Sequence, residues 1–155
     1  MLLYLLRHAD ADTVAESDDA RCLSEKGLAQ AKKVARLCEA HDLQPARVLS
    51  SPVRRAHETA LIVSAHLRAE LEVAPWLACG MHPELALEEL RDHRQHASVM
   101  IVGHEPDFSR LAAHLLGIPD GDRIAVRKAS LILLDLENFR AAGAQLQFSV
   151  PCRLM

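Results

Sequence analysis

Histidine and arginine residues follow short strand-like runs at three places in the sequence. The three places are Arg7-His8 after the run 2–6, Ser51 to Arg55 at the end of the run 47–51, and His104 after the run 98–102. In open α/β sheets, ligands bind beyond the carboxyl ends of parallel strands. If these runs are neighbouring parallel strands, the histidines and arginines face one crevice.

Two arginines and two histidines in one crevice would suit a phosphoryl group. A guanidinium pairs its N–H groups with phosphoryl oxygens and keeps its charge throughout a reaction. A neutral imidazole can attack phosphorus and form a phosphohistidine intermediate, which water then hydrolyses. The second histidine and the arginines would stabilise the equatorial oxygens of the transferring group. These residue types therefore indicate phosphoryl transfer.

Strands and helices alternate along most of the chain. We expect strands at 2–6, 47–51, 72–74 and 98–102, and helices at 25–41, 52–67, 83–93 and 106–116. Ser24 suits the N-cap of the first helix, and Pro52 suits the first turn of the second. Residues 130–136 and 145–150 indicate two strands joined without a long helix, as in an antiparallel edge. The pattern predicts an α/β fold, a three-layer α/β/α sandwich with a mainly parallel sheet and an antiparallel edge strand.

Composition restricts the class of protein. A length of 155 residues with 50% hydrophobic residues predicts one domain spanning residues 1–155. The net charge of -3 disfavours nucleic acid and membrane as partners, so an anion site must be local. The four cysteines form no CxxC pair, and the N-terminus does not resemble an export signal. We therefore expect a cytoplasmic protein with reduced thiols.

Nine histidines raise the question of a metal site. His8, Asp10 and Asp12 could be imagined as a ligand cluster, but the sequence contains neither an HExxH motif nor paired Cys/His spacings. We therefore expect no metal and no cofactor.

Three motifs in chain order carry a resemblance to a known family. They are Arg7-His8-Ala9, Ser50-Ser-Pro-x-x-Arg55-Ala-x-x-Thr59-Ala, and Val102-Gly-His104-Glu-Pro. Together they resemble the histidine phosphatase superfamily, and most closely its small bacterial branch, the SixA-type phosphohistidine phosphatases. The resemblance implies that His8 is the phosphorylated nucleophile, that Arg7 and Arg55 clamp the phosphoryl oxygens, and that His104 completes the pocket. It also implies that Arg21 and Ser51 bind substrate.

The family pattern distinguishes Arg55 from Arg54. Arg55 is the arginine followed by Ala56 and, four positions on, by Thr59. Because adjacent helical residues point about 100° apart, only one of the two arginines should face the site.

The sequence departs from the family in two respects. Ala9 replaces the usual glycine, which is tolerated if φ is negative and strained if φ is positive. The carboxylic acid that protonates the leaving oxygen in other branches has no clear counterpart, and Trp76 to Glu84 is the candidate region. An imidazole leaves phosphorus more easily than an alkoxide does, so a missing acid favours a P–N substrate.

We therefore predict a phosphatase that hydrolyses phosphohistidine on a partner protein, such as a phosphotransfer domain or phosphocarrier, and releases inorganic phosphate. Two alternatives remain open. The same mechanism could act on a small phosphomonoester, or the chain could bind phosphate without catalysis. Simple anion binding needs only the arginines, so the histidine at position 8 argues against the second alternative.

Overall fold

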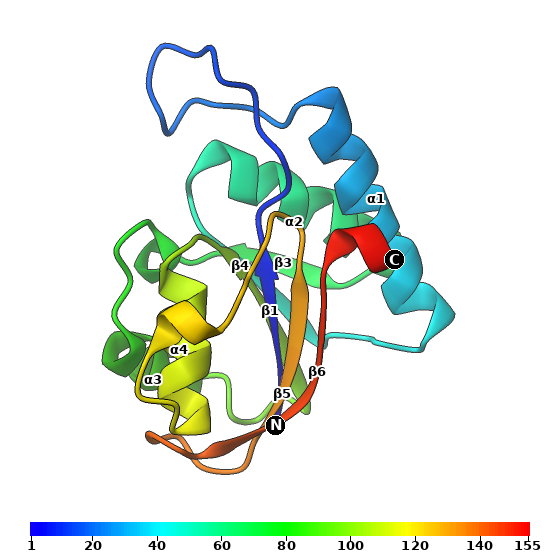
Figure 1. The fold of residues 1–155 in the computed structure, drawn as a ribbon. Coiled ribbons are helices and arrows are strands. Elements are labelled where there is room, and N and C mark those ends of the chain that lie inside the picture. The colour runs from blue at the N-terminus through cyan, green and yellow to red at the C-terminus, as the bar shows by residue number, and fades with distance from the viewer.

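The computed structural model describes residues 1–155 as one six-stranded sheet with helices on both faces (Figure 1). The strands are β1 (Leu2–Arg7), β2 (Arg47–Ser50), β3 (Glu70–Val73), β4 (Ser98–Gly103), β5 (Leu131–Leu136) and β6 (Ala144–Val150). The α-helices are α1 (Glu25–Ala40), α2 (Arg54–Leu67), α3 (Pro83–Arg91) and α4 (Asp107–Leu116). Short 3₁₀ turns are η1 (Pro75–Leu77), η2 (Gly121–Arg123) and η3 (Cys152–Leu154).

The strand order is β3-β2-β4-β1-β5-β6. β3, β2, β4 and β1 pair in parallel, whereas β5 pairs antiparallel with β1 and β6 antiparallel with β5. The predicted fold class is confirmed, and the antiparallel part contains two strands. All six residues of β4 are buried, which explains its unbroken apolar sequence.

Alternate residues of β1 pack into two separate cores, because successive side chains of a strand point to opposite faces. Leu3 and Leu5 pack with α3 and α4, and Tyr4 and Leu6 pack with α1 and α2. The sheet is therefore the middle layer of three, as Figure 1 shows. No helix in the chain is both long and apolar enough to span a membrane.

Several predicted boundaries were wrong. Pro52 lies outside α2, which begins at Arg54, because Ser51 Oγ accepts the Val53 N–H at 3.2 Å and holds residues 51–53 in a turn. Val53 is the N-cap of α2, with an extended backbone.

Other elements also differ from their predicted bounds by one or two residues. β3 begins at Glu70 rather than 72, because Glu70 pairs with Arg47 in the ladder and forms an ion pair with it. The side chains of β3 are mostly exposed, so its sequence lacks the apolar pattern that identifies a buried strand. α3 ends at Arg91 rather than 93, where the backbone turns, and α4 begins at Asp107, with Pro106 as its N-cap.

The start of α1 is packed against the segment that follows β1. The Asp10 carbonyl accepts the Ser24 N–H at 3.1 Å, and a Cβ added to Gly27 would lie 1.9 Å from the same carbonyl oxygen. Gly27 therefore permits a close approach of two backbones.

We expect Gly27→Ala to destabilise the protein by roughly 1–3 kcal/mol, because the methyl group forces the two backbones apart. At an open helical position, the same change would instead stabilise by about 1 kcal/mol. Urea unfolding of the variant shows whether the free energy of unfolding falls or rises. A midpoint equal to or above that of the wild type would contradict the close approach, and Ala29→Gly at an exposed site on α1 supplies the propensity control.

Candidate active site

Three buried side chains, His8, Ser51 and His104, lie just beyond the carboxyl ends of β1, β2 and β4. Main-chain hydrogen bonds hold the ends of these strands in register, side by side. The His8 N–H donates to the Gly103 carbonyl at 2.9 Å, and the Ser51 N–H donates to the Val102 carbonyl at 2.9 Å. The topology therefore brings together residues that are far apart in sequence.

The His8 ring is oriented by its own neighbour. Nδ1 lies 2.7 Å from the Ala9 carbonyl oxygen, which can only accept a hydrogen bond, so Nδ1 carries the proton of the neutral ring. Nε2 then has a free lone pair, and Arg55 Nε donates to it at 3.3 Å. Burial, with a smaller effect from the charges of His104, Arg55 and Arg7, lowers the pKa of His8 to about 3. The ring is therefore uncharged at neutral pH and able to attack as a nucleophile.

Arg55 is buried beside His8, whereas Arg54 is exposed and pairs with Glu58 at 2.8 Å. The Arg55 guanidinium reaches the loop between β1 and α1, donating to the Asp18 carbonyl at 2.7 Å and pairing with the Asp18 carboxylate at 3.0 Å. Cys79 Sγ lies 3.8 Å from the same guanidinium.

Arg7 is only partly exposed and donates from Nη1 to the Val126 carbonyl at 2.8 Å. Its Nε is buried without a partner in the protein. Burial lowers the pKa of Arg7, Glu105 raises it and Arg55 lowers it. A guanidinium remains charged under these conditions, so Arg7 contributes a fixed positive charge near the pocket.

His104 lies against His8, with ring centroids 5.3 Å apart and the ring planes tilted by 52°. Its Nε2 is 2.8 Å from Ser51 Oγ, while Nδ1 is buried and unpartnered. Ser51 Oγ already accepts the Val53 N–H, so its own proton is available to His104 Nε2. In the ring form with N–H at Nδ1, Nε2 accepts the Ser51 hydroxyl proton and the Nδ1–H has no partner in the protein.

Burial and the charge of Arg55 lower the pKa of His104 to about 4, against smaller opposing effects of Asp19 and Asp18. The His104 ring, which lies against His8, is therefore uncharged at neutral pH.

Arg21 joins the site indirectly, through Asp18. Its Nε donates to the Asp12 carbonyl at 2.5 Å, and its Nη1 pairs with Asp18 Oδ1 at 2.9 Å. The Asp18 carboxylate thus bridges Arg21 and Arg55. Residues 18–27 also agree with the family pattern, but sequence reasoning gave a role in this stretch only to Arg21 and none to the exposed Asp18.

Thr59, on α2, supports the segment that carries His8, a contact that the sequence alone left open. Its Oγ1 accepts the Ala9 N–H at 3.1 Å and donates to the Arg55 carbonyl at 2.7 Å. Ala9 is not among the residues with positive φ, so alanine is unstrained where the family usually has glycine.

The segment from Trp76 to Glu84 brings no carboxylate into hydrogen bonding distance of His8 or His104. Glu84 is exposed and lies 3.9 Å from His114. The carboxyl group next in sequence to His104 is that of Glu105, which is partly exposed and accepts the Ser109 N–H at 3.0 Å. Burial raises the pKa of Glu105, against opposing hydrogen bonds from Ser109 and the charge of Arg7.

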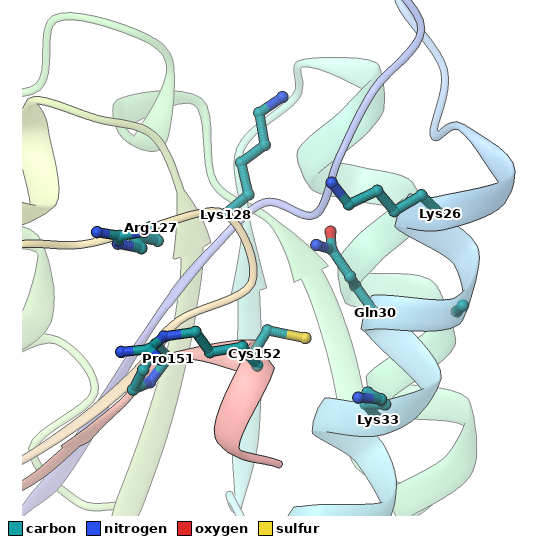
Figure 2. Close-up of a pocket in the computed structure, with 9 residues that line it drawn as sticks. Lys26, Gln30, Lys33, Arg127, Lys128, Pro151 and Cys152 are labelled. Carbon is teal, nitrogen blue, oxygen red and sulfur yellow. The ribbon is translucent and has the colours of Figure 1, made fainter.

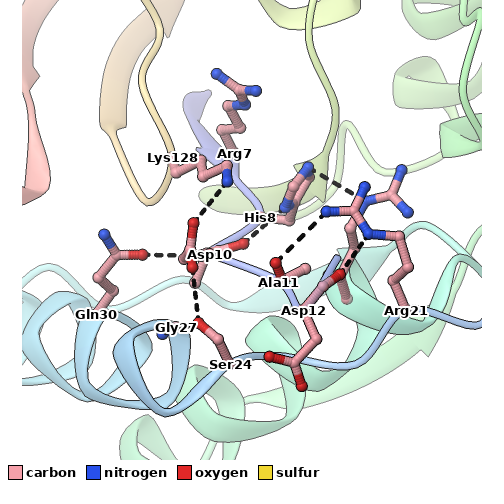
Figure 3. Close-up of polar contacts among 12 residues, drawn as sticks. Arg7, His8, Asp10, Ala11, Asp12, Arg21, Ser24, Gly27, Gln30 and Lys128 are labelled. Carbon is pink, nitrogen blue, oxygen red and sulfur yellow. Dashed lines mark hydrogen bonds and ion pairs between the residues drawn. The ribbon is translucent and has the colours of Figure 1, made fainter. Parts of the chain in front are cut away.

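Asp10 and Asp12 do not join His8 in a ligand set. The Asp10 carboxylate is held by Lys128 Nζ at 2.6 Å and by Ser24 Oγ at 2.7 Å (Figure 3). No group of three or more His, Cys, Asp or Glu side chains is placed to hold a metal ion.

Comparison with known proteins defines the class of protein. The family profile described as histidine phosphatase superfamily (branch 1) matches residues 3–78. The chain is also 31% identical over 119 residues to phosphohistidine phosphatase SixA of Escherichia coli K12, covering 74% of each protein. This chain belongs to the histidine phosphatase superfamily and is a phosphatase.

Its similarity within that superfamily is to the SixA type. A structure of the protein histidine phosphatase SixA complexed with tungstate matches with a TM-score of 0.88 and 25% identity, covering 100% of both chains. The alpha-ribazole phosphatase from Shigella flexneri has the same fold, with a TM-score of 0.81 at 19% identity over 98% of this chain and 97% of that one. Phosphatases named for other substrates therefore share this fold.

We expect the His8 ring to remain neutral down to about pH 4, because its lowered pKa of about 3 keeps the proton off Nε2. An NMR titration of the ring resonances, with the His8 signal identified by its loss in His8→Ala, measures this. The unfolded state binds the proton near pH 6.5, so stability is greatest above that pH and falls as the pH is lowered toward about 3. A His8 midpoint near the ordinary value would contradict the arrangement.

Proposed function

We propose that this protein hydrolyses phosphohistidine on a partner protein by way of a phosphorylated His8. The observation that carries the proposal is the His8 ring, which is neutral, has Nδ1 bonded to the Ala9 carbonyl and presents its Nε2 lone pair beside the Arg55 guanidinium. A protein that only bound phosphate could do so with its arginines and would not need the neutral His8 ring.

In the first step, His8 Nε2 attacks phosphorus and the substrate N–P bond breaks. The bonding electrons return to the substrate imidazole, which leaves as a neutral ring when its other nitrogen is protonated. The His8 ring becomes cationic as the new N–P bond forms, and the Ala9 carbonyl 2.7 Å from Nδ1 stabilises that charge. Arg7, Arg55 and the free Nδ1–H of His104 would bind the phosphoryl oxygens.

In the second step, water attacks phosphorus and the bond to His8 Nε2 breaks. Nε2 recovers its lone pair, the proton of the water passes to solvent, and inorganic phosphate is released. Ser51 orients His104 through its 2.8 Å hydrogen bond, and Arg21 acts through Asp18. An easily expelled imidazole explains why no carboxylate needs to contact the two histidines.

We expect His8→Ala to lower phosphate release from a phosphohistidine protein by at least about a thousandfold, because the intermediate cannot form. The assay contains EDTA and includes a panel of phosphomonoesters. Arg55→Ala should also lose most activity, whereas Arg54→Ala, on the exposed side of α2, is the matched control and should retain it. Full activity of His8→Ala would overturn the mechanism, and loss of wild-type activity in EDTA would contradict the expectation of no metal. Tight phosphate binding without turnover would favour a binding module.

A second candidate function, hydrolysis of a small phosphomonoester, is favoured by Glu105. Glu105 follows His104 in sequence, its side chain is partly buried and its pKa is raised, as a general acid for an alkoxide leaving group requires.

We expect Glu105→Gln to change turnover of a phosphohistidine protein by less than about threefold, because imidazole needs no acid. The amide side chain of this variant keeps an oxygen that can accept the Ser109 N–H, so the fold is preserved. If an ester is the substrate, the same variant should lose about a hundredfold or more in kcat. Steady-state kinetics on both substrates decide between them, and Glu84→Gln, which changes an exposed carboxylate, is the control.

A further inference from the structure

A cationic groove of about 490 Å³ lies between α1 and the segments that flank β5 and β6 (Figure 2). Five of its nine lining residues are basic: Lys26, Lys33, Arg127, Lys128 and Arg153. They come from α1, from the chain preceding β5 and from η3. We call these five residues and the hollow between them the basic groove.

Helical spacing places the lysines of α1 on one side of the groove. Lys26 and Lys33 are seven positions apart, with Ala29 and Gln30 between them on the same stripe. The small side chain of Ala29 leaves room between the two lysines. Seven residues of helix span about 10 Å, which is the length of roughly three residues of extended chain.

Most of these charges have no acidic partner. Lys26, Lys33, Arg127 and Arg153 take part in none of the ion pairs of the chain. Lys128 is the exception, because its Nζ pairs with Asp10 at 2.6 Å. Four cations without an ion-pair partner around one hollow favour the binding of a ligand with several separated negative charges.

The basic groove adjoins the main chain that carries His8, through Asp10. Gln30 Oε1 accepts the Asp10 N–H at 2.8 Å, and Lys128 holds the Asp10 carboxylate, as Figure 3 shows. The Ala129 N–H donates to the His8 carbonyl at 3.2 Å. A molecule that enters the groove therefore lies next to the loop that carries His8.

The basic groove is a local positive region on a chain whose net charge is negative. The net charge is -3, so an acidic partner is repelled by the molecule as a whole and can be attracted only locally. The cations are spread along a groove rather than gathered at one point, which suits side-chain carboxylates along a polypeptide better than a single phosphate.

We propose that the basic groove docks an acidic segment of the partner protein and so directs the phosphohistidine of that partner to His8. This inference rests on the proposed function, because it identifies the chemistry of the partner that the same site would serve.

The test uses two synthetic peptides of equal length with one central phosphohistidine, flanked by glutamates in one peptide and by glutamines in the other. We expect the wild type to favour the glutamate peptide in kcat/KM by about tenfold at low salt and to lose the preference at high salt. Fluorescence anisotropy with the unphosphorylated peptides measures docking without turnover.

Lys33→Glu and Arg153→Glu should each remove the preference for the glutamate peptide. Lys32→Glu is the matched control, because it makes the same charge change on the next residue of α1 but lines a different hollow against α2. Preference retained in Lys32→Glu and lost in Lys33→Glu supports the proposal. Equal loss in both variants, or equal binding of the two peptides by the wild type, overturns it.

The two proposals fail in different ways. If neither peptide releases phosphate but the glutamate peptide still binds more tightly through Lys33, the proposed function fails and the basic groove stands. If both peptides are hydrolysed equally well and bind equally, the proposed function stands and the docking proposal fails.

Discussion

Parallel hydrogen bonding between β1, β4 and β2 sets the level at which the three strands end. Arg7 pairs with Gly103 in register, and Ser50 pairs with Val102. A slip of one residue in either pairing would move a histidine or a serine to the opposite face of the sheet. Burial of both faces of β4 opposes such a slip, because every shifted side chain would lose its packing. The geometry of the candidate site is thus a consequence of the two cores.

The charge of the Arg55 guanidinium acts on the two imidazoles and on the Asp18 carboxylate. Two buried imidazoles near this charge remain neutral, and burial is the larger cause for each. The Asp18 carboxylate offsets the charge from the loop side, and hydrogen bonds and charges from Arg21 and Arg55 lower its pKa. The candidate site therefore combines fixed positive charge with two uncharged rings, which suits the binding of a dianion and attack by nitrogen.

Much of the arrangement could be predicted from local sequence patterns. The apolar runs of β1 and β4 identify buried strands, and their ends place His8 and His104 near one another. Asp18 could not be found in this way, because its contact with Arg55 joins positions 37 residues apart through an irregular loop. The exposed strand β3 lacks an apolar pattern, and its start depends on pairing with β2.

The basic groove illustrates the same limit on a larger scale. Its cations come from three segments that are far apart in the sequence: α1, the chain before β5 and the C-terminal turn. Only the packing of η3 near α1 brings them together. Tertiary proximity of this kind has no periodic signal in a single sequence.

The hydrogen bond from His8 Nδ1 ends on a main-chain oxygen, that of Ala9, rather than on a carboxylate side chain. No single side-chain replacement can delete that acceptor, and a change at position 9 leaves it in place as long as the backbone keeps its path. The tautomer of His8 therefore depends on the path of the backbone rather than on the identity of any side chain. Residues of the loop around Asp18 can therefore change while His8 Nε2 keeps its orientation.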